Sequence, residues 1–278
     1  MTGGGTGITG GVARGLAEVG ANVALVSRSL EHLEPAARAI NHARQRVRVS
    51  SPTNRGPQAG TPPGMVDREG STESERNIGE AFAFAADVRK PEEVEKAITA
   101  TVERFGKVDI VINGAAGNFL CAAEELSPNG FGTVVDIDLK GTFNVCRAAF
   151  AELKKNRGQI LNISATLHYL GTPMQLHVSA AKAGVDALTK NLAVEWGRYG
   201  IRVNAIAPGP IADTEGMKRL VPEPIKEKLL KRIPLGRFGL IKDIENAAVF
   251  LCSDAASYIN GAVIVVDGGH WLSANKLI

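Results

Sequence analysis

The sequence predicts a single α/β domain, residues 1–278, built on a doubly wound and mostly parallel sheet. Three observations predict this fold. Short apolar runs alternate with helical patterns along the chain, a glycine-rich turn opens it, and the next apolar run ends about 20 residues after that turn. Apolar residues make up 44% and charged residues 22% of the 278 residues, so the chain can bury the core of one large domain.

Six apolar runs predict strands that are buried on both faces, because a parallel sheet covered by helices needs continuous apolar strands. They are "NVALV" (22–26), "AFAFAA" (81–86), "VDIVI" (108–112), "GQILNI" (158–163), "RVNAIA" (202–207) and "AVIVV" (262–266). Between them we expect helices at 10–19, 30–42, 91–105, 137–155, 178–199 and 241–252. Pro91, followed by "EEVEKA", suits the first turn of its helix.

Residues 44–80 interrupt this alternation. They are rich in Pro, Gly, Ser and charge, and they lack any periodicity. A connection this long inside a compact domain is usually disordered or carries an appended function. Because nothing in it resembles a binding motif, we predict a disordered insertion at 44–80.

The start of the chain is also irregular, because "MTGGGTGITGG" opens on the glycine turn with no strand before it. Such a turn works when a buried strand delivers the chain to it and a helix leads away. We therefore expect a fragment, or a chain begun at an internal methionine, whose first strand and any targeting peptide are missing. We expect such a chain to fold and express poorly.

Composition argues against several classes of protein. The formal net charge of +3 is too small to indicate nucleic-acid binding. No run approaches the roughly 18 apolar residues of a membrane span, so we expect none. Cys121, Cys146 and Cys252 lack metal-ligand spacing, which predicts buried thiols in a reducing compartment and no metal site.

The stretch "VSRS" at 26–29 bears on the cofactor. A site for NAD usually has an acidic residue here to bind the ribose hydroxyls. Ser27 and Arg28 instead offer a hydroxyl and a guanidinium, which suit a 2′-phosphate and favour NADPH over NADH. The alternative is a solvent-facing arginine at the end of a strand.

Several motifs together resemble the short-chain dehydrogenase/reductase family, over the whole chain except 44–80. They are "TGGGTGI", "INGAAGNF", the lysine of "SAAKAG", "RVNAIAPGPI" and "GAVIVVDGG". The resemblance implies a Rossmann-type fold, a nicotinamide cofactor and a homo-oligomer, typically a tetramer. Within the family, "AAGNF", "PGPIADTEGMKRL" and "DGGHWL" are similar to the 2,4-dienoyl-CoA reductases, particularly the peroxisomal type.

The resemblance implies which residues contact the cofactor. Besides Ser27, Arg28 and Lys182, they are Gly3, Gly5, Gly7 and Ile8 at the pyrophosphate, Asp87 and Val88 at the adenine, Asn113, Gly114 and Ala115 at the ribose, and Pro208, Gly209, Ile211 and Thr214 over the nicotinamide. Two positions depart from the family pattern. Thr9 replaces the last glycine of the turn, and Gly114 replaces the second asparagine of an Asn-Asn-Ala-Gly signature.

The catalytic positions depart further. Where the family has a proton-donating tyrosine and a serine, this chain has Val178 and Ala165, so carbonyl reduction is not expected. Gln175 also excludes the tyrosine spacing of enoyl-ACP reductases. Lys182 remains, and Asp138 stands where the family usually has an asparagine. The resemblance implies that these two are catalytic, whereas an acid near a helix start has an ordinary role beside the helix dipole.

Reduction of a conjugated thioester suits such a site, because the developing enolate needs hydrogen-bond donors more than a phenol. The resemblance implies that Asn118 and Phe119 contact the acyl thioester. It also implies that Arg89, Lys218 and Arg219 bind the phosphates of CoA. Two other side chains near the site are His177, a candidate donor or a packed histidine, and Tyr169, whose spacing from Lys182 does not match a catalytic tyrosine.

These observations predict an NADPH-dependent 2,4-dienoyl-CoA reductase that forms 3-enoyl-CoA during β-oxidation of unsaturated fatty acids. The alternatives are a 2-enoyl-CoA or other short-chain reductase, and an inactive NADPH-binding regulator. We expect a peroxisome or related organelle, although the final "NKLI" does not match a peroxisomal tripeptide. A mitochondrial location stays open because of the start of the chain.

Overall fold

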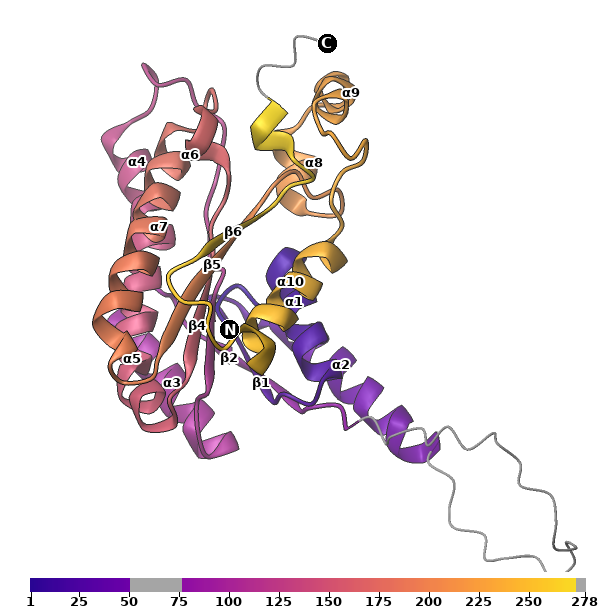
Figure 1. Ribbon diagram of the computed structural model, residues 1–278, viewed down its shortest axis with the longest axis vertical. Coiled ribbons are helices and arrows are strands. Elements are labelled where there is room, and N and C mark those ends of the chain that lie inside the picture. Colours follow the sequence, from indigo (N-terminus) through magenta and orange to yellow (C-terminus); the bar gives the residue numbers. More distant parts are fainter. Residues whose placement is uncertain (51–76, 274–278) are drawn as a thin grey trace, which may run out of the picture.

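A computed structural model describes residues 1–50 and 77–273 of the chain. It confirms the predicted α/β class, and every strand pair in it is parallel (Figure 1). Strand order is β2-β1 in one part and β3-β4-β5-β6 in the other. The strands are β1 (Val23–Ser27), β2 (Ala81–Ala85), β3 (Ile110–Asn113), β4 (Gln159–Ile163), β5 (Arg202–Pro208) and β6 (Val263–Val266).

Helices cover both faces of these strands. On one face lie α1 (Gly7–Glu18), α2 (Leu30–Ser50) and α10 (Ile241–Cys252), and on the other lie α3 (Pro91–Phe105), α4 (Pro128–Val135), α5 (Gly141–Asn156) and α7 (Leu176–Gly197) (Figure 1). The remaining elements are the π-helical segment η1 (Asp136–Lys140), the helices α6 (Leu167–Leu170), α8 (Glu215–Leu220) and α9 (Glu223–Lys231), and the 3₁₀ turns η2 (Asp254–Ala256) and η3 (His270–Ser273). Within the described ranges, no helix has the length and apolar character needed to cross a membrane.

The prediction of a disordered insertion at 44–80 was wrong at both ends. Helix α2 continues to Ser50. At the other end Ile78 is buried in the core, and Glu80 pairs with Arg44 and Arg104. These contacts explain why the two ends of 44–80 differ from the prediction. Ile78 and Glu80 show no periodic pattern in the sequence, yet Ile78 packs into the core and Glu80 pairs with Arg44 of α2 and Arg104 of α3. The stretch 51–76 lies outside the described residues.

Burial also differs from the prediction at the two edges of the sheet. The apolar character of β2 and β6 predicted strands that are covered on both faces. Both are instead half-buried along most of their length. Each is an edge strand among the described residues, so one side of its backbone lacks a neighbouring strand.

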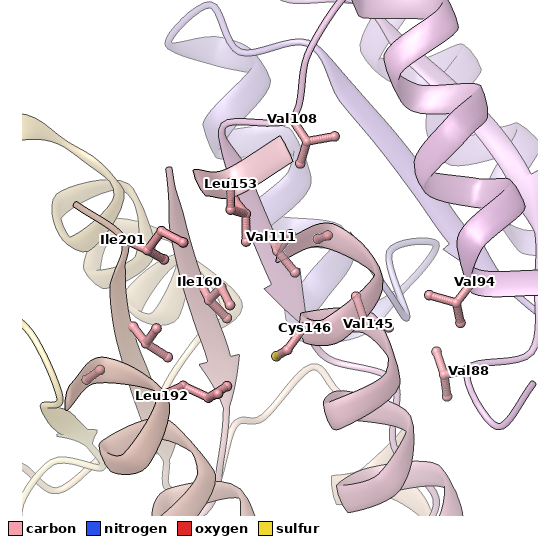
Figure 2. Packing of buried hydrophobic residues seen from close by; sticks show 13 residues of the cluster. Val88, Val94, Val108, Val111, Val145, Cys146, Leu153, Ile160, Leu192 and Ile201 are labelled. Atoms are coloured by element: carbon pink, nitrogen blue, oxygen red, sulfur yellow. The ribbon is translucent and has the colours of Figure 1, made fainter. Parts of the chain in front are cut away.

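The principal core lies between β3, β4, β5 and the helices α3, α5 and α7. Figure 2 shows Val111, Cys146, Leu153 and Ile160 meeting there, all of them buried. Burial raises the pKa of the Cys146 thiol to about 12, so this cysteine stays a neutral, apolar side chain. The core holds the carboxyl ends of these strands in place, where the candidate site lies.

A gap separates β1 from β3, where the order of the sheet is interrupted. Thr2 forms single parallel bridges with both Val26 and Asn113, and the amino group of Met1 donates to the carbonyl of Ala24 at 2.8 Å. Behind these contacts lies a cavity of about 330 Å³, here called the inter-strand cavity. Its lining includes residues 20–24 and 107–112 and the side chains of α3 and α5 that face the gap.

Candidate active site

A larger cavity of about 670 Å³ lies at the carboxyl ends of the strands, and we call it the carboxyl-end cavity. Open α/β sheets bind ligands at this edge. Fourteen of the residues predicted from the sequence line it: Gly3, Gly5, Gly7, Ile8, Ser27, Gly114, Asn118, Asp138, Lys182, Pro208, Gly209, Ile211, Thr214 and Arg219. The structure therefore brings the glycine turn, the lysine and the 208–219 segment to one place.

The glycine turn fits a diphosphate group. Gly3 has a φ of +68°, and a Cβ on it would lie 2.6 Å from the carbonyl oxygen of Gly114. Gly7 has a φ of +58° with open space around it, and it begins α1. The first turn of α1 has no side-chain cap and no acidic residue, so its backbone N–H groups and dipole favour an anion.

Thr9 and Gly114, the two residues that depart from the family pattern near the glycine turn, lie next to each other. A Cβ on Gly114 would lie 2.5 Å from Oγ1 of Thr9 and 2.9 Å from its methyl carbon. Thr9 therefore occupies the space that a side chain at position 114 would need. The threonine and the glycine form one packing arrangement between α1 and the end of β3.

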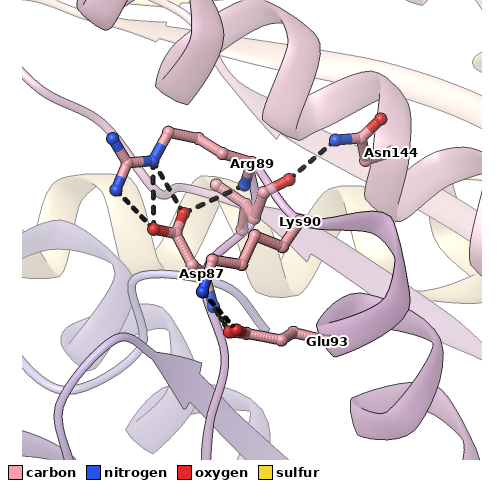
Figure 3. Close-up of polar contacts among 6 residues, drawn as sticks. Asp87, Arg89, Lys90, Glu93 and Asn144 are labelled. Atoms are coloured by element: carbon pink, nitrogen blue, oxygen red, sulfur yellow. Dashed lines mark hydrogen bonds and ion pairs between the residues drawn. The ribbon is translucent and has the colours of Figure 1, made fainter.

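A group of charges follows β1 and β2, outside the lining of the carboxyl-end cavity. The side chain of Arg89 contacts both carboxylate oxygens of Asp87, with Nε at 3.0 Å from each (Figure 3). The hydrogen bonds from Arg89 hold the pKa of Asp87 below its usual range, and the charge of Arg28 acts in the same direction. Arg28 is exposed beside Ser27. Asp87 and Arg28 thus lie on the same side, next to the predicted ribose position.

Several predicted contact residues do not line the carboxyl-end cavity. Val88 is buried in the core, where its carbonyl accepts a hydrogen bond from Asn144 at 2.8 Å. Asn113 is also buried and donates to Asn162 at 2.9 Å, so its side chain joins β3 to β4. Neither residue lines the carboxyl-end cavity. The residues outside the cavity lining are Arg28, Asp87, Val88, Arg89, Asn113, Ala115, Phe119 and Lys218.

Asp138 and Lys182 form a buried ion pair at the base of the cavity. Oδ2 of Asp138 lies 3.2 Å from Nζ of Lys182, and the two side chains are 0% and 8% exposed. Oδ1 of Asp138 accepts from the backbone N–H of Gly117 at 2.7 Å, and Nζ of Lys182 donates to the carbonyl of Ile163 at 2.9 Å. Asp138 belongs to a π-helical segment, η1 (Asp136–Lys140), inserted between α4 and α5. Such insertions are frequent at functional sites.

The cavity lining, as far as the structure describes it, contains no tyrosine. Val178 and Ala165 both line the cavity, at the positions where a tyrosine and a serine were absent from the sequence. Asn118 donates to Oε1 of Gln175 at 2.8 Å, and both residues line the cavity. A charged pair, an amide and an apolar wall can therefore bind a polar head group and move a proton, but offer no phenol.

His177 lies outside the cavity lining. It is fully buried, and its ring packs against Phe119 with centroids 4.3 Å apart. Burial lowers the pKa of His177, so that the ring is neutral at neutral pH. Phe119 is turned toward this histidine. The aromatic pair therefore supports the segment that carries Asn118.

The segment after β5 forms the opposite wall. Thr214 caps α8 by accepting a hydrogen bond from the N–H of Met217 at 3.1 Å. Arg219 lines the cavity, whereas Lys218 does not and pairs at 2.9 Å with Glu215, which lines it. Of the two basic residues, only Arg219 contributes to the lining.

Sequence reasoning missed much of the cavity lining. The missed residues include Thr6, His32, Ala116, Gly117, Ile163, Ser164, Thr166, Leu167, Leu170, Thr172, Glu215, Gly216, Met217, Leu220, Val221, Leu229 and His270, and Gln175 was noted only because it excludes a tyrosine spacing. Many are apolar or small residues on short helices and connections. A signal existed for residues 116–117 and 215–220, because they lie inside the motifs "INGAAGNF" and "PGPIADTEGMKRL".

Comparisons with known proteins identify the family of this chain. A family profile described as enoyl-(acyl carrier protein) reductase matches residues 65–270. A crystal structure titled as a short chain dehydrogenase from Bacillus anthracis is 38% identical, with a TM-score of 0.76, covering 97% of this chain and 94% of that one. The chain belongs to the short-chain dehydrogenase/reductase family. A nicotinamide cofactor is implied by that membership, and the glycine turn at α1 fits its diphosphate.

Two curated relatives within the short-chain dehydrogenase/reductase family are named peroxisomal 2,4-dienoyl-CoA reductase, (3E)-enoyl-CoA-producing. The one from Danio rerio is 41% identical over 280 residues, covering 100% of this chain and 82% of the relative. The one from Saccharomyces cerevisiae is 60% identical over 185 residues, covering 66% of this chain. The match spans 63% of the length of the yeast relative.

Proposed function

We propose that this chain is an NADPH-dependent 2,4-dienoyl-CoA reductase that produces 3-enoyl-CoA in the β-oxidation of unsaturated fatty acids. The observation that carries the proposal is the buried Asp138–Lys182 pair beside an apolar wall at Val178 and Ala165. The names of the relatives support the same activity.

The chain's own residues suit a substrate whose charge develops on a thioester oxygen. A bound nicotinamide cofactor would supply a hydride to C5 of the dienoyl group. We assign Lys182 and Asn118 to the stabilisation of the resulting enolate, because hydrogen-bond donors aimed at developing charge supply most of such catalysis. Asp138 and Lys182 would hold the water that delivers a proton to C2, which leaves the double bond between C3 and C4.

For the cofactor, we propose NADPH. Ser27 and Arg28 stand at the end of β1 in place of an acidic residue, and the carboxylate of Asp87, on which the charge of Arg28 acts, is held by Arg89. A 2′-phosphate beside Arg28 would gain a charge-assisted contact. We assign Arg219, which lines the cavity, to the binding of the CoA phosphates. Arg89 and Lys218 are weaker candidates because each is paired with an acidic side chain.

The names of the relatives favour a peroxisomal location, and family membership favours a homotetramer. Large apolar side chains on the outer helices support self-association, since Phe143 of α5 is 46% exposed and Val194 of α7 is 83% exposed. Light scattering after gel filtration measures the number of subunits.

The test is oxidation of NADPH with 2,4-hexadienoyl-CoA, followed by analysis of the product formed in D₂O. We expect turnover and deuterium at C2, as a 3-enoyl product requires. Deuterium at C4 would mean a 2-enoyl product and a different placement of the proton donor. Turnover of 2-enoyl-CoA alone would favour the rival reductase, and NADPH binding without turnover of any acyl-CoA would favour an inactive regulator.

A further inference from the structure

A polar cluster lies behind one wall of the carboxyl-end cavity and has no part in the proposed chemistry. Its centre is Asp186 on α7, one turn after Lys182, with a side chain 8% exposed. Oδ1 of Asp186 accepts from the hydroxyl of Ser164 at 2.5 Å. Oδ2 lies 2.8 Å from Nε2 of His168 and accepts from the hydroxyl of Tyr169 at 3.2 Å. We call these four residues the Asp186 cluster.

The partners of Asp186 all belong to one wall of the cavity, residues 164–172. Ser164 lines the cavity, as do five other residues of this stretch: Ala165, Thr166, Leu167, Leu170 and Thr172. His168, Tyr169 and Asp186 do not line it, so the cluster supports the wall from behind. Helix α6 within this stretch has a single turn, which is too short to be stable by itself. Contacts with the rest of the fold must therefore hold it.

Tyr169 extends the support to the last described segment of the chain. Its ring packs edge-on against Trp271 of η3, with centroids 5.5 Å apart. His270, the neighbour of Trp271, lines the cavity. Burial, and then the negative charge of Asp186, raise the pKa of Tyr169 to about 12, so the phenol keeps its proton and donates at physiological pH. The cluster thus connects two walls that lie far apart in sequence.

We propose that Asp186 is a positioning residue that holds the wall 164–172 and, through Tyr169, the segment at Trp271 in the arrangement that binds an acyl chain. The proposal rests on the proposed function for the acyl-CoA ligand. A buried carboxylate that accepts hydrogen bonds from several donors fixes its partners more firmly than neutral contacts do. A longer acyl chain covers more of this wall and depends on it more.

The test is the steady-state kinetics of Asp186→Asn with two substrates, because the amide keeps one acceptor and loses the other. With 2,4-decadienoyl-CoA we expect KM to increase about tenfold, the scale of one charge-assisted hydrogen bond. We expect a smaller increase with 2,4-hexadienoyl-CoA, and little change in kcat or in NADPH affinity. Tyr169→Phe keeps the ring and loses one donor, so KM for the longer substrate should increase about threefold. Tyr199→Phe, beyond the end of α7, is the matched control and should change nothing.

A binding measurement separates this proposal from the proposed reaction. In a Trp196→Phe background Trp271 is the remaining tryptophan of two. Its fluorescence can report binding of decanoyl-CoA, which has no double bond to reduce. If the parent chain reduces no dienoyl-CoA, yet Asp186→Asn weakens the binding of decanoyl-CoA, the reaction is wrong and the positioning role stands.

Other outcomes overturn the positioning role. One is an Asp186→Asn chain that melts earlier while KM stays unchanged for both substrates. Another is a loss of kcat or NADPH affinity as large as the change in KM. If Asp186→Asn does not fold, an unchanged KM of Tyr169→Phe for 2,4-decadienoyl-CoA overturns the role instead.

Discussion

The inter-strand cavity and the carboxyl-end cavity touch the same sheet but differ in the groups that line them. Apolar side chains such as Val94 and Val145 line the inter-strand cavity, together with the backbone edges of β1 and β3 and with polar residues that include Lys107 and Asp109. In the carboxyl-end cavity, the buried pair of Asp138 from η1 and Lys182 from α7 meets other polar side chains from helices and loops. Convergent polar groups on a largely apolar wall are typical of a ligand site.

Both linings are mostly apolar, so the feature that distinguishes the carboxyl-end cavity is its buried Asp138–Lys182 pair. An apolar space inside a core costs stability, because its lining lacks contacts. The free amino group of Met1 adds to that cost, since burial lowers its pKa to about 5. The inter-strand cavity therefore leaves space unfilled beside Met1, while the carboxyl-end cavity holds the residues that the proposed reaction needs. Each of the following predictions changes one cavity and leaves the other intact.

The largest expected effect comes from filling the inter-strand cavity. Placing an apolar strand of about 5–8 residues before Thr2 should increase the free energy of unfolding by several kcal/mol. The strand would pair backbone groups of β1 and β3 and remove the buried amino group. Urea denaturation measures the change, and a Gly-Ser extension of equal length is the control. Cooperative unfolding and tight NADPH binding by the 278-residue chain, without gain from the strand, would contradict this prediction.

The amino group of Met1 predicts a dependence of stability on pH. Its pKa is 8.0 when unfolded and about 5 when folded, so the unfolded chain binds more protons between these values. The free energy of unfolding should therefore increase by up to about 4 kcal/mol from pH 5 to pH 8. Burial also lowers the pKa values of His177 and His270, which adds a slope of the same sign near pH 6. Acetylation of Met1 removes the charge of its amino group, so only the smaller slope due to His177 and His270 should remain. If acetylation leaves the whole pH dependence of stability unchanged, the amino group is not buried.

In the carboxyl-end cavity the largest effect should follow loss of the charged pair. Asp138→Ala and Lys182→Ala should each lower turnover of a dienoyl-CoA roughly 10²-fold, the usual scale for positioned acid–base groups. Lys182→Ala should also weaken NADPH binding, and Asp138→Ala should not. Val178→Ala, on the wall one turn before Lys182, is the control and should lower turnover only modestly. Near-normal turnover by Asp138→Ala would show that the aspartate has no part in the mechanism. Asp138→Asn keeps the size of the side chain, so it tests whether a loss of turnover in Asp138→Ala results from loss of folding.

The smallest effect concerns the cofactor. Arg28→Asp should weaken NADPH binding at least tenfold, because one charge-assisted contact of roughly 1.5–3 kcal/mol is lost and a like charge replaces it. Cofactor titrations with NADPH and NADH measure the change. Arg38→Asp on α2 makes the same change of charge away from the cavity and should leave both affinities unchanged. A parent chain that already prefers NADH would refute the role of Arg28.

Local patterns in the sequence determined the architecture. Each predicted strand and helix is present, because apolar runs and helical periodicity report directly which side of an element is buried. The resemblance to the short-chain dehydrogenase/reductase family also predicted, from the sequence alone, that the glycine turn, Asp138, Lys182 and the 208–219 segment belong to one site. The ends of 44–80 were predicted wrongly, since the burial of Ile78 and the pairing of Glu80 depend on partners distant in sequence.

Only the tertiary structure decided which residues meet. The contact between Thr9 and Gly114 joins two departures that looked independent along the chain. Val88 and Asn113 carried family positions for a ligand, yet their side chains pack into the core. The Asp186 cluster has no sequence motif, because its members come from α7 and from the short connection after β4. Contacts between separate elements depend on how those elements pack, and local periodicity contains no information about that packing.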